Sequence, residues 1–361
     1  MAKSKKRGIR RILRVDTLLV ALVLSCVYLL TGKFGGEEAQ TIWEEVVTPL
    51  NTAESAHDFG ATDESAQSQL SDSELNALLG DMPKATQCKP IRFLMMNAHN
   101  YFVREDTQRT HYKLTIKKEE ARDAVAEVIA SAAPEIVGLV EIGGPHALAD
   151  LQERLRLRGL DYPYSKILLR SGEDRALAVL SMHPIVQDHS RANCNLLGKK
   201  RQKMLRGILD VTIQVGENRF YRIMGAHLKS RVSDDPAAAT ARRTLEARTL
   251  AFYLQREIKK QPNMPVLVYG DWNDGPADAS LKILKQGVSK DSALSQVKAS
   301  DSAGQTWTIY YKTGQEYSAF DLIFVNSVLR SRRGRSCDSG IVDIPAAQEA
   351  SDHRAIWCEL R

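Results

Sequence analysis

The sequence predicts an α/β protein whose strands are buried in a two-sheet core. Short apolar runs recur from residue 91 to the C-terminus, and each is bounded by polar or turn residues. The runs are short and partly continuous, as expected for strands that are covered on both faces. Two longer stretches, 117–131 and 237–260, have the length and composition of helices.

The predicted strands follow one another from residue 91 to the C-terminus. They cover residues 91–96, 136–140, 176–180, 207–215, 220–226, 265–269, 322–325 and 355–360. Isolated polar residues stand where many of these strands give way to a loop. Loops on a rigid scaffold are where catalytic groups usually lie, so these positions are the first candidates for a functional site.

Composition limits the class of protein. The chain has 361 residues, of which 43% are hydrophobic and 26% charged, an ordinary globular composition. This excludes a disordered chain, a collagen-like chain and a multi-span membrane protein. The length permits one large domain or two medium ones, and five cysteines are too few for a disulfide scaffold.

Charge is distributed unevenly along the chain. Residues 1–14 hold seven basic residues and no acid, whereas residues 36–83 hold eleven acids and no Lys or Arg. The formal net charge of the whole chain is +6, so residues 84–361 carry +10. A basic body suits an anionic partner such as nucleic acid, a phosphoester or a membrane surface, although charge alone fits general solubility equally well.

An uncharged apolar stretch, 17–32, follows the basic N-terminus. As a helix it spans about 24 Å, at ~1.5 Å per residue, and flanking residues can lengthen it toward the ~30 Å of a membrane core. No good small-x-small cleavage site follows it, so we expect an uncleaved transmembrane anchor over 16–33, with a cleaved signal peptide as the alternative.

The basic flank sets the expected orientation of this anchor. By the positive-inside rule the N-terminus, 1–15, lies in the cytosol and the body lies outside it. We therefore expect a single-pass plasma (inner) membrane protein with a periplasmic or extracellular body, 85–361. Residues 34–84 have the composition of an acidic tether, with short helices over 38–48 and from the capping box at Ser71–Glu74 to Gly80.

A set of polar residues along the body carries the chemistry. Each taken alone has an ordinary structural interpretation, as a turn residue or a buried imidazole with its hydrogen bonds satisfied. Together they supply oxygen ligands for a hard divalent cation and two imidazoles for proton transfer. In chain order they are Asn97, Glu141, His227, Asp271, Asn273, Asp321, Asp352 and His353.

Other kinds of site are not indicated. No cysteine is spaced with a histidine as a zinc site requires. The sequence has no P-loop, no Rossmann glycine pattern and no Gly-x-Ser-x-Gly elbow.

On eight segments the chain resembles the endonuclease/exonuclease/phosphatase superfamily, the DNase I-like metal-dependent phosphoesterases. The segments are FLMMNAHNYF, PEIVGLVEI, LAVLSMHPI, RGILDV, MGAHLKS, VLVYGDWND, FDLIFVN and SDHRAIW. The resemblance covers about 90–361. It implies a four-layer α/β sandwich, in which two packed mixed β-sheets are flanked by helices and the active site lies at one end.

The resemblance also implies a metal site. Glu141 is the expected principal ligand of Mg²⁺, with Asn97 beside it and Asp352 near the ion. Mn²⁺ is a possible substitute. Mg²⁺ keeps several waters and takes only one or two carboxylates, which agrees with the modest number of acids in the set.

Roles in catalysis are implied in the same way. Asp271 and Asn273 are expected to position the attacking water and the phosphate. His227 is expected to contact the phosphate or to protonate the leaving group. Arg206 matches the basic residue that many members place against the substrate phosphate, and Lys229 is a second candidate for that task.

The last catalytic residue implied is His353, which is expected to act with a carboxylate partner. Asp321 is the first candidate for that partner and Asp338 the second. An imidazole held by a carboxylate suits proton transfer near neutral pH.

The expected activity is that of a Mg²⁺-dependent phosphoric ester hydrolase, and an extracytoplasmic nuclease is the favoured substrate class. A lipid (sphingomyelinase-like) or small phosphoester hydrolase is the alternative, because fold does not choose the substrate. A catalytically silent phosphate-binding module is the alternative from another class. The expected partners are the substrate and the membrane around the anchor, and no protein partner is inferred.

The cysteines give one further expectation. In the resembling fold the first and last strands are antiparallel neighbours. Cys88 precedes the first strand and Cys358 lies in the last, so a disulfide between them is expected. The alternative is free thiols at all four cysteines of the body.

Overall fold

Two mixed β-sheets form the centre of the molecule, as the sequence predicted. The computed structural model describes residues 69–103, 115–311, 314–334 and 337–361. All eight predicted strands and both predicted helices are present, the latter as α5 (Glu119–Ala132) and α7 (Pro236–Lys260).

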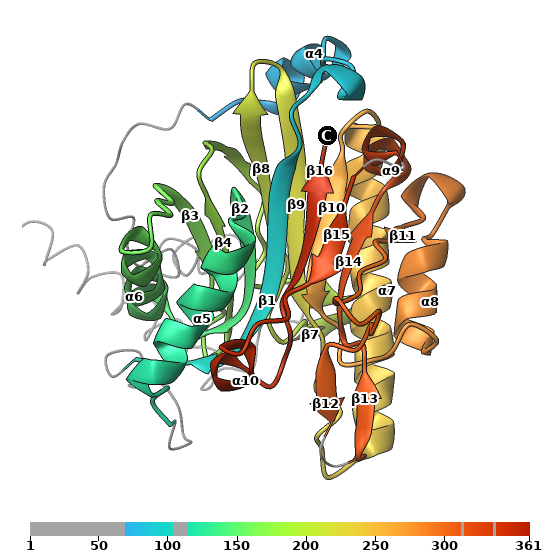
Figure 1. The fold of residues 1–361 in the computed structure, drawn as a ribbon. Helices are drawn as coiled ribbons and strands as arrows, with labels where there is room; N and C mark the ends of the chain where they lie inside the picture. Colours follow the sequence, from blue (N-terminus) through green and yellow to red (C-terminus); the bar gives the residue numbers. More distant parts are fainter. Residues whose placement is uncertain (1–68, 104–114, 312–313, 335–336) are drawn as a thin grey trace, which may run out of the picture. The chain divides into compact units, whose positions relative to one another are not determined.

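The first sheet has the strand order β15-β16-β1-β2-β4-β3 (Figure 1). Its β1 and β2 are parallel and its other neighbours antiparallel. The strands are β1 (Ile91–Tyr101), β2 (Ile136–Ile142), β3 (Tyr164–Leu168), β4 (Ala176–Ser181), β15 (Ser339–Ile341) and β16 (Ile356–Leu360).

The second sheet has the order β11-β14-β10-β9-β8-β5, and β9 and β10 are its parallel pair. Two small hairpins, β6–β7 and β12–β13, stand apart from both sheets. The strands are β5 (Ile185–Asp188), β6 (Asn195–Leu196), β7 (Lys199–Lys203), β8 (Leu209–Gly216), β9 (Arg219–His227), β10 (Val266–Asp271), β11 (Ser295–Gln296), β12 (Ile309–Tyr311), β13 (Glu316–Ser318) and β14 (Asp321–Val325).

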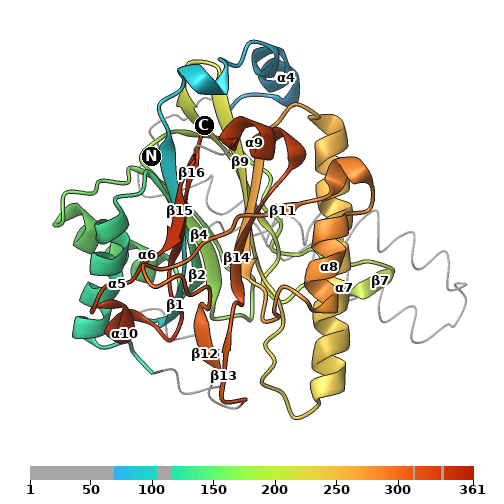
Figure 2. The same ribbon diagram turned by 45° about the vertical axis from the view of Figure 1, so that its right-hand side comes forward.

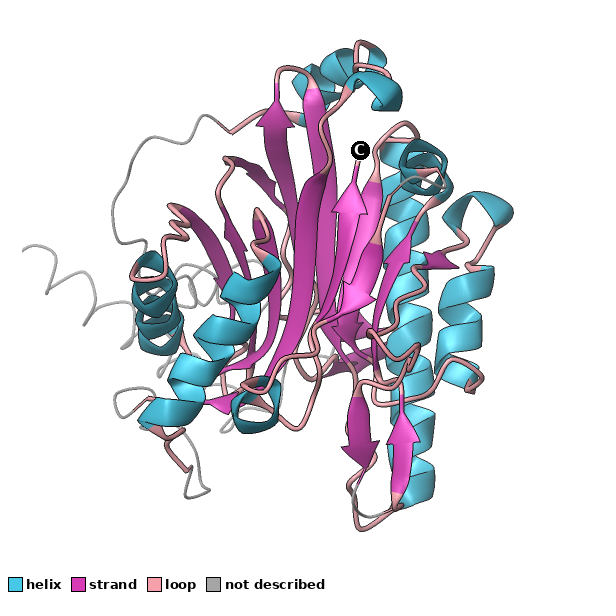
Figure 3. Cartoon of the chain, in the orientation of Figure 1, coloured by secondary structure: helices cyan, strands magenta, loops and turns pink. Residues whose placement is uncertain are grey.

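Helices cover the outer face of each sheet, which completes four layers (Figure 3). Helices α5, α6 (Pro145–Arg156) and α10 (Ala347–Ala350) pack on the first sheet, and α7 and α8 (Ala279–Gln286) on the second. The strands alternate accordingly: in β1, Leu94 belongs to the core under the helices, whereas Phe93 belongs to the core between the sheets. Shorter helices are η2 (Ala85–Gln87), η4 (Lys290–Ser292) and α9 (Ser327–Arg333).

Tyr269 of β10 sets the contact between the two sheets. Its ring occupies the space where a side chain on Gly138 or Gly225 would be, since a Cβ there would lie 2.7 or 2.6 Å from the ring. The buried hydroxyl donates to the carbonyl oxygen of Ala178 in the opposite sheet, at 2.8 Å. The glycines therefore let the sheets approach closely beside the strand that carries Asp271.

Helix α4 (Asp72–Gly80) confirms the predicted capping box but packs on the body. Ser71 accepts from the backbone of Glu74, and Glu74 accepts from the backbone of Ser71. The side chains of Leu75 and Leu79 are buried in the core that α7 forms with the second sheet. The helix lies within the expected tether, 34–84, but its apolar face contributes to the core of the body.

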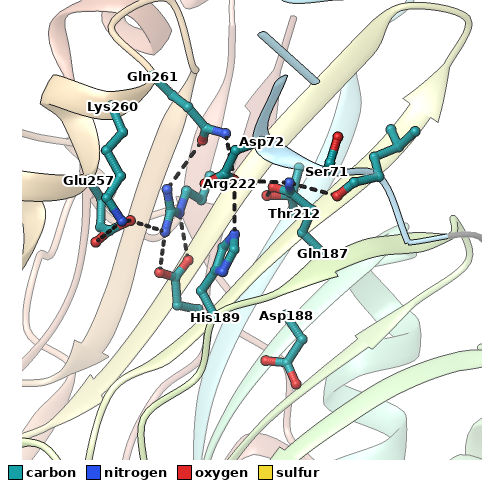
Figure 4. A network of polar contacts seen from close by, with 12 residues as sticks. Ser71, Asp72, Gln187, Asp188, His189, Thr212, Arg222, Glu257, Lys260 and Gln261 are labelled. Atoms are coloured by element: carbon teal, nitrogen blue, oxygen red, sulfur yellow. Dashed lines mark hydrogen bonds and ion pairs between the residues drawn. The ribbon is translucent and has the colours of Figure 1, made fainter. Parts of the chain in front are cut away.

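Polar contacts fasten the start of α4 to the same sheet (Figure 4). The Asp72 carboxylate accepts from Gln187 and Gln261, and Gln187 also donates to the Leu70 carbonyl. Gln261 in turn accepts from the buried Arg222, which forms a two-pronged ion pair with Asp210 at 2.6 and 2.7 Å. The N-terminal end of the described chain is thus tied to a buried charge network.

The expected membrane segment and most of the expected tether lie outside the described residues. The expectations concerned are the cytosolic N-terminus 1–15, the anchor 16–33 and the tether with its helix over 38–48. Among the helices of residues 69–103, 115–311, 314–334 and 337–361, none combines the length and apolar character needed to cross a membrane.

The expected disulfide between Cys88 and Cys358 is wrong. The first and last strands are antiparallel neighbours, but their register places Cys358 opposite Phe93, five residues beyond Cys88. Cys358 is buried in the core between the sheets, whereas the thiol of Cys88 donates to the Lys84 carbonyl. Both are free thiols, as are Cys194 and Cys337.

The packing of α4 predicts a stability effect. We expect Leu75→Ala to lower the free energy of unfolding of the full chain by about 2–5 kcal/mol, the usual result of emptying a buried leucine site. Ala77→Ser, on the exposed side of the same helix, is the matched control and should change it by less than about 0.5 kcal/mol. Chemical denaturation measures both, and equal small effects would show that α4 does not stabilise the body.

Candidate active site

The predicted site residues converge at one end of the sandwich because strand register places them side by side. Asp271, the last residue of β10, lies opposite His227 of β9 on one side and Asp321 of β14 on the other. From the first sheet, Asn97 of β1 faces Asp271 across the gap between the sheets, and Glu141, the last residue but one of β2, lies nearby. Helix α4 lies at the opposite end, beside the residues that precede β10 (Figures 1 and 2).

Asp271 is the centre of this cluster and is 2% exposed. Its Oδ2 accepts from Asn97 at 3.0 Å, and its Oδ1 accepts from the backbone N–H of Asn273 at 2.9 Å. The Nε2 atoms of His227 and His353 lie 3.6 and 4.0 Å from Oδ2. Burial raises the pKa of Asp271, and the positive charge on His353 offsets this only in part.

His353 is held by Asp321. Its Nδ1 lies 2.7 Å from Oδ2 of Asp321, which also accepts from the Thr308 hydroxyl at 2.8 Å. Burial opposes a charge on His353, but the carboxylates of Asp321, Asp271 and Asp352 outweigh it and raise its pKa to about 10. His353 is therefore an imidazolium at neutral pH in this arrangement of charges.

Asp338, the other candidate partner, does not reach His353. Its backbone N–H donates to Glu359 and its carbonyl accepts from Arg333, at the far end of β16. Of the two carboxylates that the sequence left open, only Asp321 therefore contacts the imidazole.

His227 has the opposite electrostatic state. Burial, together with the positive charges of Arg206, His353 and Arg175, lowers the pKa of His227 well below its usual range. Its Nε2 faces Asp271 and lies 3.9 Å from Oε1 of Glu141. Its buried Nδ1 has no hydrogen-bond partner in the described part of the chain. The site thus pairs a neutral imidazole with a charged one.

Glu141 reaches the cluster through an unusual backbone conformation. Its φ of 64° lies in the left-handed region, at a break in the register between β2 and β4. Oε2 accepts from the Asn100 backbone at 3.0 Å and lies 3.7 Å from Nε of Arg175. Asn273 is also left-handed, with φ 52°. Such strain persists only where the surrounding structure holds it, and it gathers at functional sites.

The donor atoms fit a hard divalent cation. Ligand atoms of Glu141, His227 and Asp271 lie within 4.8 Å of one another, and the same holds for Asp271, Asp321 and His353. In the second group the imidazole is hydrogen-bonded to Asp321, so the first group is the better candidate for the cation site. The carboxylate oxygens of Glu141 and Asp271 suit Mg²⁺ or Mn²⁺.

Asp352 lies at the open rim of the site. Its side chain is 40% exposed, with Oδ1 3.2 Å from Nδ1 of His99 and 3.9 Å from Nε2 of His353. The structure therefore places it near the cluster but not among the carboxylates that surround Asp271.

The two predicted phosphate-binding residues differ in their surroundings. Arg206 has its Nε and Nη1 shut off from solvent without a hydrogen-bond partner among the residues described. Buried N–H groups without a partner are costly, so these two atoms point to an anionic ligand. Lys229 instead donates from Nζ to the Val232 carbonyl, and burial with Arg206 and Arg243 lowers the pKa of its ammonium group. The ammonium group of Lys229 is therefore already hydrogen-bonded within the loop that follows β9.

Sequence reasoning missed three supporting residues. Arg175 bonds Asn100 beside Glu141, Thr308 bonds Asp321, and the Ser351 hydroxyl donates to the Asn97 carbonyl while accepting from the backbone of His353. Arg175 directly precedes the apolar run of β4, so the search for polar residues at the ends of predicted strands could have found it. Thr308 carries no signal in sequence, and Ser351, although it begins the segment SDHRAIW, is not marked by it as a support of Asn97, because both roles depend on packing.

The family of the protein is now shown. The model of the Endonuclease/Exonuclease/phosphatase family matches residues 116–353, and the chain belongs to this family. Its fold is accordingly that of a DNase I-like phosphoesterase. No curated protein sequence matches the chain.

Solved structures show the same fold at low sequence identity. The human Nocturnin catalytic domain with bound sulfate is 17% identical, with a TM-score of 0.52 over 77% of this chain and 99% of that one. Truncated Caenorhabditis elegans TDP2 is 14% identical, with 0.51 over 75% and 97%. Sphingomyelinase C from Streptomyces griseocarneus is 16% identical, with 0.51 over 76% and 100%.

The surroundings of Arg206 predict linked effects on stability and anion binding. We expect inorganic phosphate to raise the melting temperature of the wild-type chain and to leave that of Arg206→Met unchanged. Without phosphate, the variant should melt no lower than the wild type, because it removes two buried N–H groups that have no hydrogen-bond partner among the described residues. Arg248→Met, an exposed change on α7, is the control and should respond to phosphate as the wild type does. Equal phosphate shifts in all three proteins would contradict an anion site at Arg206.

Proposed function

We propose that the protein is a divalent-metal-dependent phosphodiesterase, and that it acts as an extracytoplasmic nuclease. One observation carries the chemistry: five predicted residues from both sheets meet in one buried cluster. They are Glu141, His227, Asp271, Asp321 and His353. Family membership supports hydrolysis of phosphoric esters as the reaction class.

Glu141 is the residue that would hold the cation, with Asn97 beside it and Asp271 and His227 nearby. A bound Mg²⁺ or Mn²⁺ supplies positive charge against the phosphate oxygens. The metal site is therefore proposed at the end of β2 and β10, where the strain at Glu141 turns its carboxylate toward the second sheet.

Asp271 is the proposed acceptor of the proton from the attacking water. Its raised pKa brings the carboxylate closer to the basicity that proton transfer near neutral pH needs. Asn97 and the backbone of Asn273 hold its two oxygens in place. A carboxylate fixed in this way is ready to orient a water without rearrangement.

The cationic and neutral side chains have complementary proposed tasks. The imidazolium of His353, oriented by Asp321, lies next to Asp271 and stabilises negative charge that develops on the phosphate. Arg206 offers its unpaired nitrogens to another phosphate oxygen. His227, neutral and buried, contacts the phosphate or forms a hydrogen bond with the leaving oxygen.

Nucleic acid is the proposed substrate because the body carries a +10 charge beyond residue 83. The fold does not decide this, since the similar structures include a sphingomyelinase as well as Nocturnin and TDP2. The extracytoplasmic location, the anchor over 16–33 and the orientation set by residues 1–15 belong to the same proposal and rest on the charge pattern of the N-terminus.

The test is hydrolysis by the purified full chain of plasmid DNA, single-stranded RNA, sphingomyelin and bis-p-nitrophenyl phosphate. We expect cleavage of nucleic acid and of the small diester, lost in EDTA and restored by Mg²⁺ or Mn²⁺. Glu141→Gln and His353→Ala should each reduce the rate by about 100-fold or more while the melting temperature stays near that of the wild type. His146→Ala, on the exposed side of α6, is the control and should be fully active.

Two results would overturn the proposal. Hydrolysis of sphingomyelin alone would make the protein a lipid phosphodiesterase. Binding of Mg²⁺ by folded protein without hydrolysis of any of the four substrates would favour a phosphate-binding module.

A further inference from the structure

A cationic hairpin lies outside the cluster of catalytic residues. Hairpin β6–β7, residues 195–203, carries Lys199, Lys200, Arg201 and Lys203, and all of them are exposed. The side chains of Lys199, Lys200 and Arg201 have no ion-pair or hydrogen-bond partner in the parts of the chain that the structure describes, and Lys203 bonds Asn193. This hairpin is therefore a patch of positive charge that no described acid neutralises.

The cationic hairpin leads directly to the phosphate end of the site. Arg206 follows it after two residues, and buried Glu246 of α7 accepts from the backbone of Leu205. The second oxygen of Glu246 accepts from the backbone of Lys229, at the start of the loop after His227. One carboxylate thus joins the exit of the hairpin to the loop that follows His227.

An aromatic cluster lies on the other side of the site. Hairpin β12–β13 places Tyr310 directly opposite Tyr317, with ring centroids 4.9 Å apart, and Trp307 lies 4.9 Å from Tyr317. Tyr317 is 65% exposed and Tyr310 40%. The acid of this hairpin, Glu316, is paired with Arg231 at 3.2 Å. The cluster therefore presents aromatic faces to solvent without an unpaired negative charge at Glu316.

The aromatic cluster is connected to the catalytic residues as closely as the cationic hairpin is. Ile309 forms a β-bridge with His353, and Thr308 beside it bonds Asp321. Strand β13 leads into β14, which begins with Asp321. A ligand on these rings would therefore lie near His353 and Asp321.

Sheet order places the two surfaces on opposite sides of Asp271. The cationic hairpin precedes β8 and the aromatic hairpin precedes β14, and β9 and β10 lie between these strands. Three strand spacings amount to about 14 Å at ~4.8 Å each. Figure 2 shows the two hairpins well apart, with α7 between them in that view. A substrate that touches both must be longer than a single phosphoester.

We propose that the site binds single-stranded nucleic acid, with phosphates of the strand on the cationic hairpin and unpaired bases stacked on Tyr317 and Tyr310. A basic track combined with aromatic platforms is the general means of binding single strands, because every base has a face that can stack. In a duplex the bases are stacked on one another and cannot reach the rings. This inference rests on the proposed nuclease function and names its substrate class.

The experiment measures binding separately from cleavage. A labelled 12-nucleotide single strand and the matching duplex are titrated with the full chain in EDTA, and fluorescence anisotropy reports the Kd. The double variant Lys199→Glu/Lys200→Glu tests the hairpin, and Lys89→Glu/Lys259→Glu, exposed residues at the end of the sandwich near α4, is the charge-matched control. Tyr317→Ala tests the rings, with Tyr317→Phe as the conservative control.

We expect the hairpin variant to bind the single strand about tenfold more weakly or worse, and to reduce the slope of log Kd against log salt by about 1.4. Tyr317→Ala should weaken single-strand binding about fivefold or more and leave duplex binding unchanged. Both controls should bind as the wild type does. All variants should hydrolyse bis-p-nitrophenyl phosphate at the wild-type rate, because neither surface contacts the reacting phosphate.

The possible failures are distinguishable. If the small diester is hydrolysed but all variants bind the single strand equally, the inference is wrong while the phosphodiesterase chemistry stands. Tighter binding of duplex than of single strand also overturns it. Vesicles of anionic and of neutral lipid provide a further comparison. If the hairpin variant loses binding only to the anionic vesicles, the cationic hairpin is assigned to a membrane surface and the inference is wrong. If the wild type hydrolyses none of the substrates, but the hairpin and Tyr317→Ala variants lose single-strand binding as expected, only the proposed function is overturned.

Discussion

The structure depends on a concentration of negative charge that is nearly closed to water. Asp271 and Asp321 are 2% and 0% exposed and adjacent in register, and Glu141 of β2 in the other sheet lies close to Asp271. Like charges in a low dielectric repel strongly, so such an arrangement persists only with compensating groups. The imidazolium of His353, the amide of Asn97 and the hydroxyl of Thr308 supply that compensation in the protein itself.

The same constraint explains why the site requires both sheets. Asn97 and Glu141 come from the first sheet and His227, Asp271 and Asp321 from the second, while His353 precedes β16 of the first. Tyr269, two residues before Asp271, fills the space above Gly138 and Gly225 and bonds across the gap. Packing between the sheets therefore sets the separation of the reacting groups, and α4 with its charge network closes the opposite end of the second sheet.

Much of this arrangement could be predicted from sequence because it follows strand ends. Asn97, Glu141, His227 and Asp271 each stand at or near the end of an apolar run, and parallel register brings such residues together. The choice between Asp321 and Asp338 could not be made, because it depends on which strand lies beside β10. The same limit applies to the disulfide, where strand adjacency was correct and register was not.

Short elements and long-range contacts were beyond the sequence patterns. The hairpins β6–β7 and β12–β13 are too short for a period-2 signal, and Thr308 acts through a loop that packs against a distant strand. Helix α4 was recognised by its cap, but its apolar face was too short to reveal that it is buried on the body. The left-handed backbone at Glu141 also had no sequence signal, since that conformation is rare for glutamate.

The most direct test of the account is the position of a bound cation. Crystals of the protein soaked in Mn²⁺ would be examined by anomalous scattering, for the wild type and for Glu141→Gln. The account predicts one strong peak beside Glu141 and Asp271 in the wild type, and its loss in the variant. A peak that persists in Glu141→Gln, or one that lies between Asp321 and His353 instead, would contradict the assignment of the metal site and the catalytic roles derived from it.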